Sequence, residues 1–210
     1  IDIYLPDLGI GFEFNGIWWH SDKFKNENYH LKKYESSIIN DIQLVTIWED
    51  DWVKNREICE SFILNKIGKS SNKIFARKCE IKEITNIKVI KDFLNTNHIQ
   101  GYVKSDYKIG LFYQGELVSL MTFDKYEGRK KMSIDDWNLN RFCNKINFNV
   151  VGGASKLLNY FINSKSCSRI ISYADSDWSY GDVYFNLNFS LINKSYPDYK
   201  YIVNNKRIHK

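Results

Sequence analysis

The sequence has little of what marks a secreted or membrane-spanning protein. Its 210 residues include only 4 Cys and 2 Pro, and no apolar run reaches the roughly 18 residues that a transmembrane helix needs. The cysteines are widely spaced, with no Cys-x-x-Cys pair, which argues against a zinc knuckle and against a disulfide framework. We therefore expect free, buried thiols and a cytoplasmic protein with no membrane partner.

Charge of neither sign dominates the chain. There are 30 Lys and Arg against 25 Asp and Glu, a formal net charge of +5. An excess of this size permits binding to nucleic acid, and many other soluble proteins share it. The length suits one large or two small domains, each able to bury a core.

The first fifteen residues show a strand, a turn and a second strand. In the second strand Glu13 and Asn15 alternate with apolar residues, so both side chains should leave one face of the sheet. Asp2 lies before the turn, on the neighbouring strand. Carboxylates from adjacent strands can hold a hard divalent cation, and the pattern predicts a Mg²⁺ or Mn²⁺ site at Asp2 and Glu13.

Further elements follow in a specific order: the segment Trp18-Trp19-His20, a helix around residues 28–33 and a strand at 43–49. This order resembles the PD-(D/E)XK nucleases, most closely the very-short-patch-repair and phage homing endonucleases. The resemblance implies a magnesium-dependent endonuclease acting on double-stranded DNA in a phage-infected or bacterial cell. By the family pattern, Asp2 holds the metal and His20 acts near the attacked phosphate.

The chain departs from that pattern in two places. Asn15 stands where many relatives have Lys, Asp or His, and the sequence begins at Ile1, in a strand. We therefore expect the helix that precedes this strand in the superfamily to be absent.

Three further residues fit the same site and also have plainer explanations. His30 and Lys33 are three residues apart on one helical face, where they can contact phosphate or face solvent. Glu49 opens a Glu-Asp-Asp run that suits either a carboxylate near the metal or a helix start. The complete predicted site is Asp2, Glu13, Asn15, His20, His30, Lys33 and Glu49.

An apolar stripe, with a period of three to four residues, predicts a helix over residues 51–67. Gly68 ends it, and the polar stretch 69–73 follows. We place a domain boundary there, with a nuclease-like domain at 1–68 and a second domain at 73–210.

The second domain has its own order of elements. The patterns predict strands at 73–84, 107–113, 117–123, 137–142 and 169–173, helices at 86–97, 152–162 and 181–187, and a final strand pair around Pro197. This order, with segments 151–158 and 181–189, resembles the GNAT (Gcn5-related N-acetyltransferase) fold. The fold class predicted for the whole chain is α/β (α+β).

In acetyltransferases of this fold, a glycine turn at a helix N-terminus binds the pyrophosphate of acetyl-CoA. The resemblance places that loop at Gly152, Gly153 and Ala154, although a tight strand-to-helix turn, with glycine for close packing, is the favoured explanation. Asn149 stands where the family has Arg or Gln, and Asn188 interrupts the usual Leu-Gly-Phe ending.

The basic and aromatic residues of the second domain allow another interpretation, a platform for DNA. The cations concerned are Arg77, Lys78, Arg129, Lys130, Lys131, Arg141 and Lys156. The leading hypothesis is an endonuclease with a GNAT-like domain. Two alternatives remain: a GNAT-type acyltransferase with a nuclease-like binding module, and a DNA-binding protein without catalysis.

Overall fold

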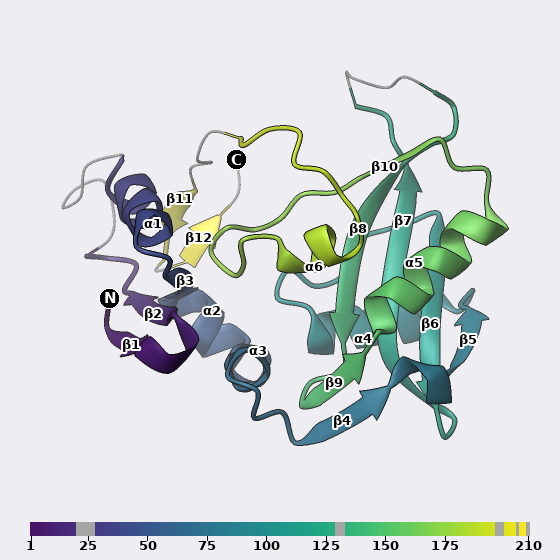
Figure 1. Cartoon of the computed structure of the whole chain (residues 1–210), viewed down its shortest axis with the longest axis horizontal. Helices are drawn as coiled ribbons and strands as arrows, with labels where there is room; N and C mark the ends of the chain where they lie inside the picture. Colours follow the sequence, from purple (N-terminus) through teal and green to yellow (C-terminus); the bar gives the residue numbers. More distant parts are fainter. Residues whose placement is uncertain (20–27, 129–132, 196–199, 205, 209–210) are drawn as a thin grey trace. The chain divides into compact units, whose positions relative to one another are not determined.

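The computed structural model shows a chain of mixed α/β structure, which confirms the predicted fold class (Figure 1). The residues described are 1–19, 28–128, 133–195, 200–204 and 206–208. Packing divides the chain into two compact units. We call residues 1–59 with 174–210 the N/C unit, and residues 60–173 the central unit. The predicted domains differ from these units in assigning residues 174–210 to the second part.

The N/C unit is built on a three-stranded sheet in the order β1-β2-β3. β1 (Ile3–Leu5) is antiparallel to β2 (Ile10–Asn15), and Gly9, with a φ of 61°, closes the turn between them. β2 is parallel to β3 (Gln43–Trp48), and α1 (Tyr29–Ile39) lies between these two strands in the sequence. The predicted strand, turn and strand are therefore present.

The predicted helix at 51–67 is two helices. α2 (Glu49–Lys54) ends at Asn55, whose φ of −124° and ψ of 36° leave the helical region, and α3 (Arg56–Lys66) begins directly after it. The remaining elements of the N/C unit come from the C-terminal segment. They are α6 (Asp182–Asn186), β11 (Tyr201–Val203) and β12 (Lys206–Ile208).

The C-terminal segment holds the outer edge of β3. Thr46 N donates to Asp177 O at 2.7 Å, and Leu44 N donates to the Tyr180 hydroxyl at 3.2 Å. The Arg207 side chain donates to Asp50 Oδ1 at 2.8 Å and to Asp51 Oδ2 at 2.5 Å. These bonds explain why residues 174–210 pack with the first 59 residues.

The central unit contains a five-stranded sheet in the order β10-β8-β7-β6-β5. Its strands are β5 (Glu80–Glu83), β6 (Tyr107–Tyr113), β7 (Glu116–Lys125), β8 (Asp136–Asn144) and β10 (Arg169–Ile171). Neighbours are antiparallel except β8 and β10, which are parallel. The predicted hairpin is the β6–β7 pair, joined at Gln114 and Gly115, both at positive φ.

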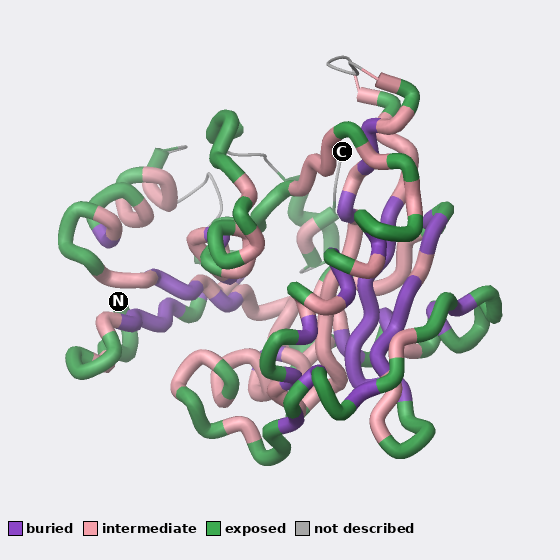
Figure 2. Tube along the Cα trace, turned by 45° about the vertical axis from the view of Figure 1, so that its right-hand side comes forward, coloured by how far each residue is buried: buried purple, intermediate pink, exposed green. Residues whose placement is uncertain are grey.

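Two helices cover the two faces of this sheet, with α5 in front and α4 behind in Figure 1. On β7, Phe123 packs on Phe161 of α5 (Gly153–Ser164), whereas Leu120 packs with Ile90 and Leu94 of α4 (Ile87–Asn97). The buried residues of the unit follow these strands (Figure 2). Within the described ranges no helix could span a bilayer, since the longest, α5, has 12 residues.

The predicted strand at 73–84 is wrong as a single element. It comprises β4 (Asn72–Phe75), a 3-10 turn (Ala76–Lys78) and β5, because the buried Ala76 turns the chain and its carbonyl accepts from Cys79 N. β4 pairs in parallel with β9 (Phe148–Val151), a strand that the sequence analysis missed. β4 and β9 form a two-stranded ribbon that leads directly into α5.

Candidate functional site

The predicted carboxylates of the N/C unit are engaged by other groups. Asp2, which is exposed, accepts a hydrogen bond from Phe14 N at 2.7 Å through Oδ2. Glu13 is buried, with 6% exposure, and forms an ion pair with Lys33 through Oε1. Partial burial opposes the charge of Lys33, but the hydrogen bond and the charge of Glu13 outweigh it and raise the pKa of Lys33. Glu13 and Lys33 are thus brought together, as a cation and carboxylate pair.

The other predicted residues lie near the carboxyl ends of the parallel strands β2 and β3. Asn15 is 1% exposed, and its Nδ2 lies 3.5 Å from Nδ1 of His30, whose ring packs on Trp48. Glu49 accepts from Ile17 N at 2.9 Å. His20 lies outside the described residues. The structure therefore brings Asn15 and His30 together, while Glu49 serves a backbone group.

These contacts correct the prediction of a magnesium or manganese site. Asp2 accepts a hydrogen bond from a backbone N–H, and Glu13 forms an ion pair with the ammonium of Lys33. Neither therefore presents a free pair of carboxylate oxygens. In the part of the chain that the structure describes, no group of three or more His, Cys, Asp or Glu could hold a metal ion. A hard divalent cation needs several such oxygen ligands, and the proposed pair does not provide them.

Asp177 has the clearest ionisation shift in the N/C unit. Its partial burial first, and the nearby charge of Asp175 second, raise the pKa of Asp177 to about 6. Trp48 Nε1 donates to Asp177 Oδ2 at 3.1 Å, which opposes this rise.

We expect Asp177→Asn to stabilise the N/C unit at pH 7.5 by about 1 kcal/mol, below the ~3 kcal/mol of the full shift because solvent reaches the group. Because the pKa of Asp177 is raised in the folded state, the folded unit is favoured while this carboxyl is protonated at low pH. That contribution to the free energy of unfolding is lost as the pH rises through 6. Asn keeps an acceptor for Trp48 without the buried charge. Chemical denaturation at pH 4 and pH 7.5 measures the difference, and a variant no more stable at pH 7.5 would refute it.

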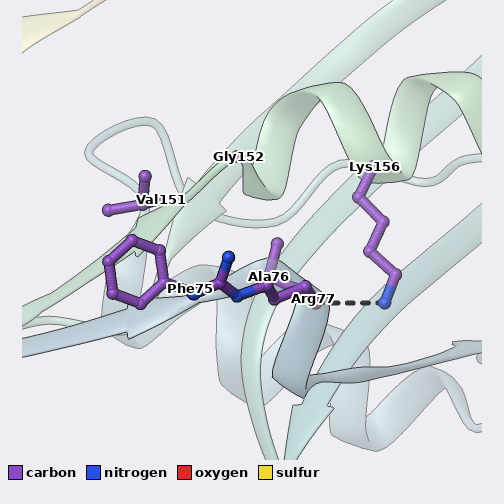
Figure 3. A pocket seen from close by; sticks show the side chains of 6 residues that line it. All are labelled: Phe75, Ala76, Arg77, Val151, Gly152 and Lys156. Carbon is purple, nitrogen blue, oxygen red and sulfur yellow. Dashed lines mark hydrogen bonds between the residues drawn. The ribbon is translucent and has the colours of Figure 1, made fainter.

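A shallow pocket, wide open to solvent, lies in the central unit where β4 and β9 meet the start of α5. It has a volume of about 460 Å³. Its lining residues are Phe75, Ala76, Arg77, Val151, Gly152 and Lys156 (Figure 3). This is the region of the predicted glycine loop.

The start of α5 suits an anion. Gly152 precedes the helix in the left-handed region, with a φ of 76°, and no side chain caps the first turn. The first N–H groups of a helix have no intrahelical acceptor, and the helix dipole adds positive potential at this end. Backbone donors and dipole together favour phosphate groups here.

Two cations from different elements reach the pocket. Lys156 Nζ donates to Ala76 O at 3.0 Å and to Cys79 O at 2.6 Å, which ties the 3-10 turn to α5 (Figure 3). Arg77 is exposed on that turn, and its guanidinium lies 5.0 Å from the centre of the Phe75 ring. Lys156 therefore positions the turn that carries Arg77.

Gly152 and Gly153 of the predicted loop are each required to be glycine for a different structural reason. Gly152 adopts a backbone conformation that side chains disfavour. A Cβ on Gly153 would lie 3.1 Å from Val150 Cγ1, so this residue must be small to let α5 pack on β9. The close-packing explanation of Gly153 is thus sound, and it is compatible with a ligand at the helix start.

Phe75 and Val151 were not predicted as lining residues, and Arg77 and Lys156 were predicted only as part of a broad basic surface. The cause is the missed strand β9, which brings residues 72–75 beside 148–151. A signal was present in the alternation Phe148, Val150 on one short run beside the glycines. Its four residues are too few for a reliable period.

A β-bulge interrupts β8 in the middle of the sheet. Phe123 pairs with Leu139 and Thr122 pairs with Arg141, so Asn140 is an extra residue on β8. Its Nδ2 donates to Ser105 Oγ at 3.2 Å and also contacts Asp124. A bulge leaves the extra residue outside the regular ladder, and here it lies on the strand that pairs in parallel with β10.

His98, at the C-terminal end of α4, is kept neutral. Burial first, and the charge of Arg141 second, lower the pKa of His98 to about 4. Its Nδ1 accepts from Gln100 N at 3.2 Å, which assigns the remaining proton to Nε2. His98 is therefore a structural group of this unit.

No protein-family model and no curated protein matches the chain. Three chains of solved structures match it, and they include the following two. One is an aminoglycoside acetyltransferase from an uncultured soil metagenomic sample, in complex with sisomicin, with a TM-score of 0.44 and 12% identity over 61% of this chain and 98% of that one. The other is an integron cassette protein from the mobile metagenome of V. cholerae, with a TM-score of 0.38 and 14% identity over 61% and 94%.

These findings correct the prediction of a magnesium-dependent endonuclease. The similar structures include an acetyltransferase and give no support to the PD-(D/E)XK part, and the N-terminal carboxylates are engaged as described. The likeness lies with the GNAT-like part, although at these TM-scores and identities it carries no argument about substrate or activity.

Proposed function

We propose that the central unit binds an acyl-CoA by its pyrophosphate and transfers the acyl group to a nucleophilic acceptor. The observation that carries the proposal is the pocket at the N-terminus of α5, with Arg77 and Lys156 beside it. Acetyl-CoA is the simplest such ligand. The GNAT-like strand order of the five-stranded sheet, in which β8 and β10 are parallel, agrees with this proposal.

The pocket suits a pyrophosphate in three respects. The first turn of α5 offers backbone N–H groups and a favourable dipole. Gly152 leaves the approach open, since the nearest atom to a Cβ added there is Ala76 Cβ, at 3.9 Å. Arg77 adds a guanidinium that can bind two phosphate oxygens at once.

Arg77 can also supply the positive charge that Asn149 lacks. The GNAT pattern has Arg or Gln at that position, and Asn149 brings no charge. Because β4 and β9 are paired, with Phe75 beside Val151, the 3-10 turn places Arg77 next to the glycine loop. A cation from a neighbouring segment thus takes the role of the one that is missing.

CoA supplies the acyl group as a thioester, and the residues of the central unit bind and orient it. We assign to the backbone N–H of Asn140, the residue that the register of β7 and β8 skips, the role of donor to the acyl oxygen as charge develops on it. His98 is not the general base, because its Nδ1 already accepts the Gln100 N–H and its pKa is about 4.

Replacement of Arg77 tests the proposal directly. We expect Arg77→Gln to weaken CoA binding roughly tenfold or more, the value of one charge-assisted hydrogen-bond pair. Lys78→Gln is the matched control, since Lys78 is also exposed on the same turn but does not line the pocket. Isothermal titration calorimetry of both variants with CoA gives the comparison.

Pantetheine, which lacks the pyrophosphate, should bind both variants equally. Absence of heat and of a thermal shift with CoA and acetyl-CoA in the unaltered protein would refute the proposal. Equal loss of CoA affinity in Arg77→Gln and Lys78→Gln would show general attraction by charge, and would also refute the assigned pocket.

A further inference from the structure

The chain's positive charge is concentrated in the central unit. Residues 60–173 contain 19 Lys and Arg against 10 Asp and Glu, a net charge of +9, whereas the remaining residues have 11 against 15, a net charge of −4. The two charges partly cancel, which is why the overall charge is only +5. A net charge of this sign on one unit favours an anionic partner larger than a single cofactor.

Two segments of the central unit contain no carboxylate at all. Residues 61–79 and residues 137–173 each have five Lys or Arg and no Asp or Glu. β4 belongs to the first segment and β9 to the second, and they are hydrogen-bonded neighbours. Pairing therefore joins two acid-free segments, distant in sequence, into one ribbon.

The outer face of this ribbon mixes cations with apolar and amide groups. Ile74 and Val150 are buried, so the alternate residues face outward. These are Lys73 and Phe75 on β4, paired with Asn149 and Val151 on β9. Phe75 is 39% exposed and Val151 is 37% exposed, so part of each apolar side chain is open to a ligand.

The cations in and next to β4 keep their charge available. Lys69, Lys73, Arg77 and Lys78 form no ion pair with any carboxylate that the structure describes. Lys145, by contrast, is neutralised by Glu116. Four available cations within ten residues, around an exposed aromatic ring, match the features of surfaces that bind single-stranded nucleic acid.

We propose that the outer face of the β4–β9 ribbon binds a single-stranded segment of nucleic acid. Phosphates contact Lys73 and Arg77, and a base stacks on Phe75, part of whose ring area remains exposed beside the Arg77 guanidinium. Asn149, next to Lys73, offers a donor and an acceptor to a base edge. This inference goes beyond the acyl transfer proposed above and does not require it. Because Phe75 and Arg77 also line the pocket, the two ligands should compete for these two residues.

Fluorescence anisotropy with a labelled oligothymidylate, across a series of salt concentrations, tests the ribbon. Phe75→Leu should weaken binding roughly tenfold, the loss of one stacked base, while Phe75→Tyr should retain the affinity. Lys73→Gln should lower the slope of log K against log salt by about 0.7, the loss of one phosphate contact to a single strand. Thermal unfolding of each variant shows that the fold is kept.

Lys91→Gln is the matched control, because Lys91 is an exposed cation of the same unit on α4. An equal effect of Lys91→Gln and Lys73→Gln would overturn the proposal, since charge alone would explain binding. So would duplex DNA bound as tightly as the single strand, or an unchanged affinity in Phe75→Leu. Lys73 does not line the pocket, so loss of oligonucleotide binding with intact CoA binding in Lys73→Gln separates the two proposals.

Discussion

Phe161→Ala is expected to lower the free energy of unfolding of the central unit by about 4 kcal/mol, within the range for large aromatic side chains in a core. Phe161 is fully buried and stacks on Phe123, with 3.7 Å between ring centres. The rings of Trp137 and Tyr107 also pack against Phe161, with their centres 5.1 and 5.6 Å from its own. Its removal leaves a cavity between three other rings, and this cavity cannot collapse without moving β6, β7, β8 or α5.

Ile162→Ala is the control for this prediction. Ile162 is the next residue of α5 and is 46% exposed, so its replacement should cost less than ~1 kcal/mol. Urea denaturation of both variants, followed by tryptophan fluorescence, measures the difference. Equal small losses would mean that the space at Phe161 is filled by rearrangement, and that α5 is less firmly fixed than its contacts indicate.

The central unit is also expected to lose about 2 kcal/mol of stability between pH 7 and pH 4, because of His98. The folded pKa of His98, about 4, lies below the ordinary 6.5. Between these values the unfolded chain binds a proton that the folded unit does not, so stability is present above 6.5 and is lost as the pH falls toward 4. The estimate is below the ~3 kcal/mol of the full shift because the ring is partly exposed.

His98→Asn removes the titrating group while it keeps a polar side chain at the end of α4. We expect the variant to lose some stability at pH 7 but to show a flatter pH dependence down to pH 4.5. Amide hydrogen exchange of β6, β7 and β8 reports on this unit separately from Asp177, whose shift acts in the opposite direction in the N/C unit. An unchanged pH dependence in the variant would assign the acid sensitivity to other groups.

The nuclease interpretation shows how a correct pattern led to a wrong function. The strands around Asp2 and Glu13 are where the sequence places them, and Glu13 and Asn15 do leave one face of β2. Both faces of β2 are buried, apart from the exposed Phe14. Alternation fixes which residues share a face, but it does not say which face meets solvent or which partner a carboxylate will find.

Much of the central unit could be predicted from local patterns. The β6–β7 hairpin, α4 and α5 each depend on contacts close in sequence, on turn residues at positive φ and on a helical apolar stripe. The α/β class and the order of these elements follow from them. Gly152 likewise indicates the start of a helix, since it supplies the backbone conformation that the strand-to-helix turn needs.

Tertiary structure alone decided the candidate site. β4 and β9 are some 75 residues apart and only four residues long, so neither has a distinctive period, and each is stable because it pairs with the other. That pairing brings Arg77 to the start of α5 and joins the two acid-free segments in one face. The sequence determined which residues carry charge, and long-range strand pairing, which no local pattern encodes, decided where those charges meet.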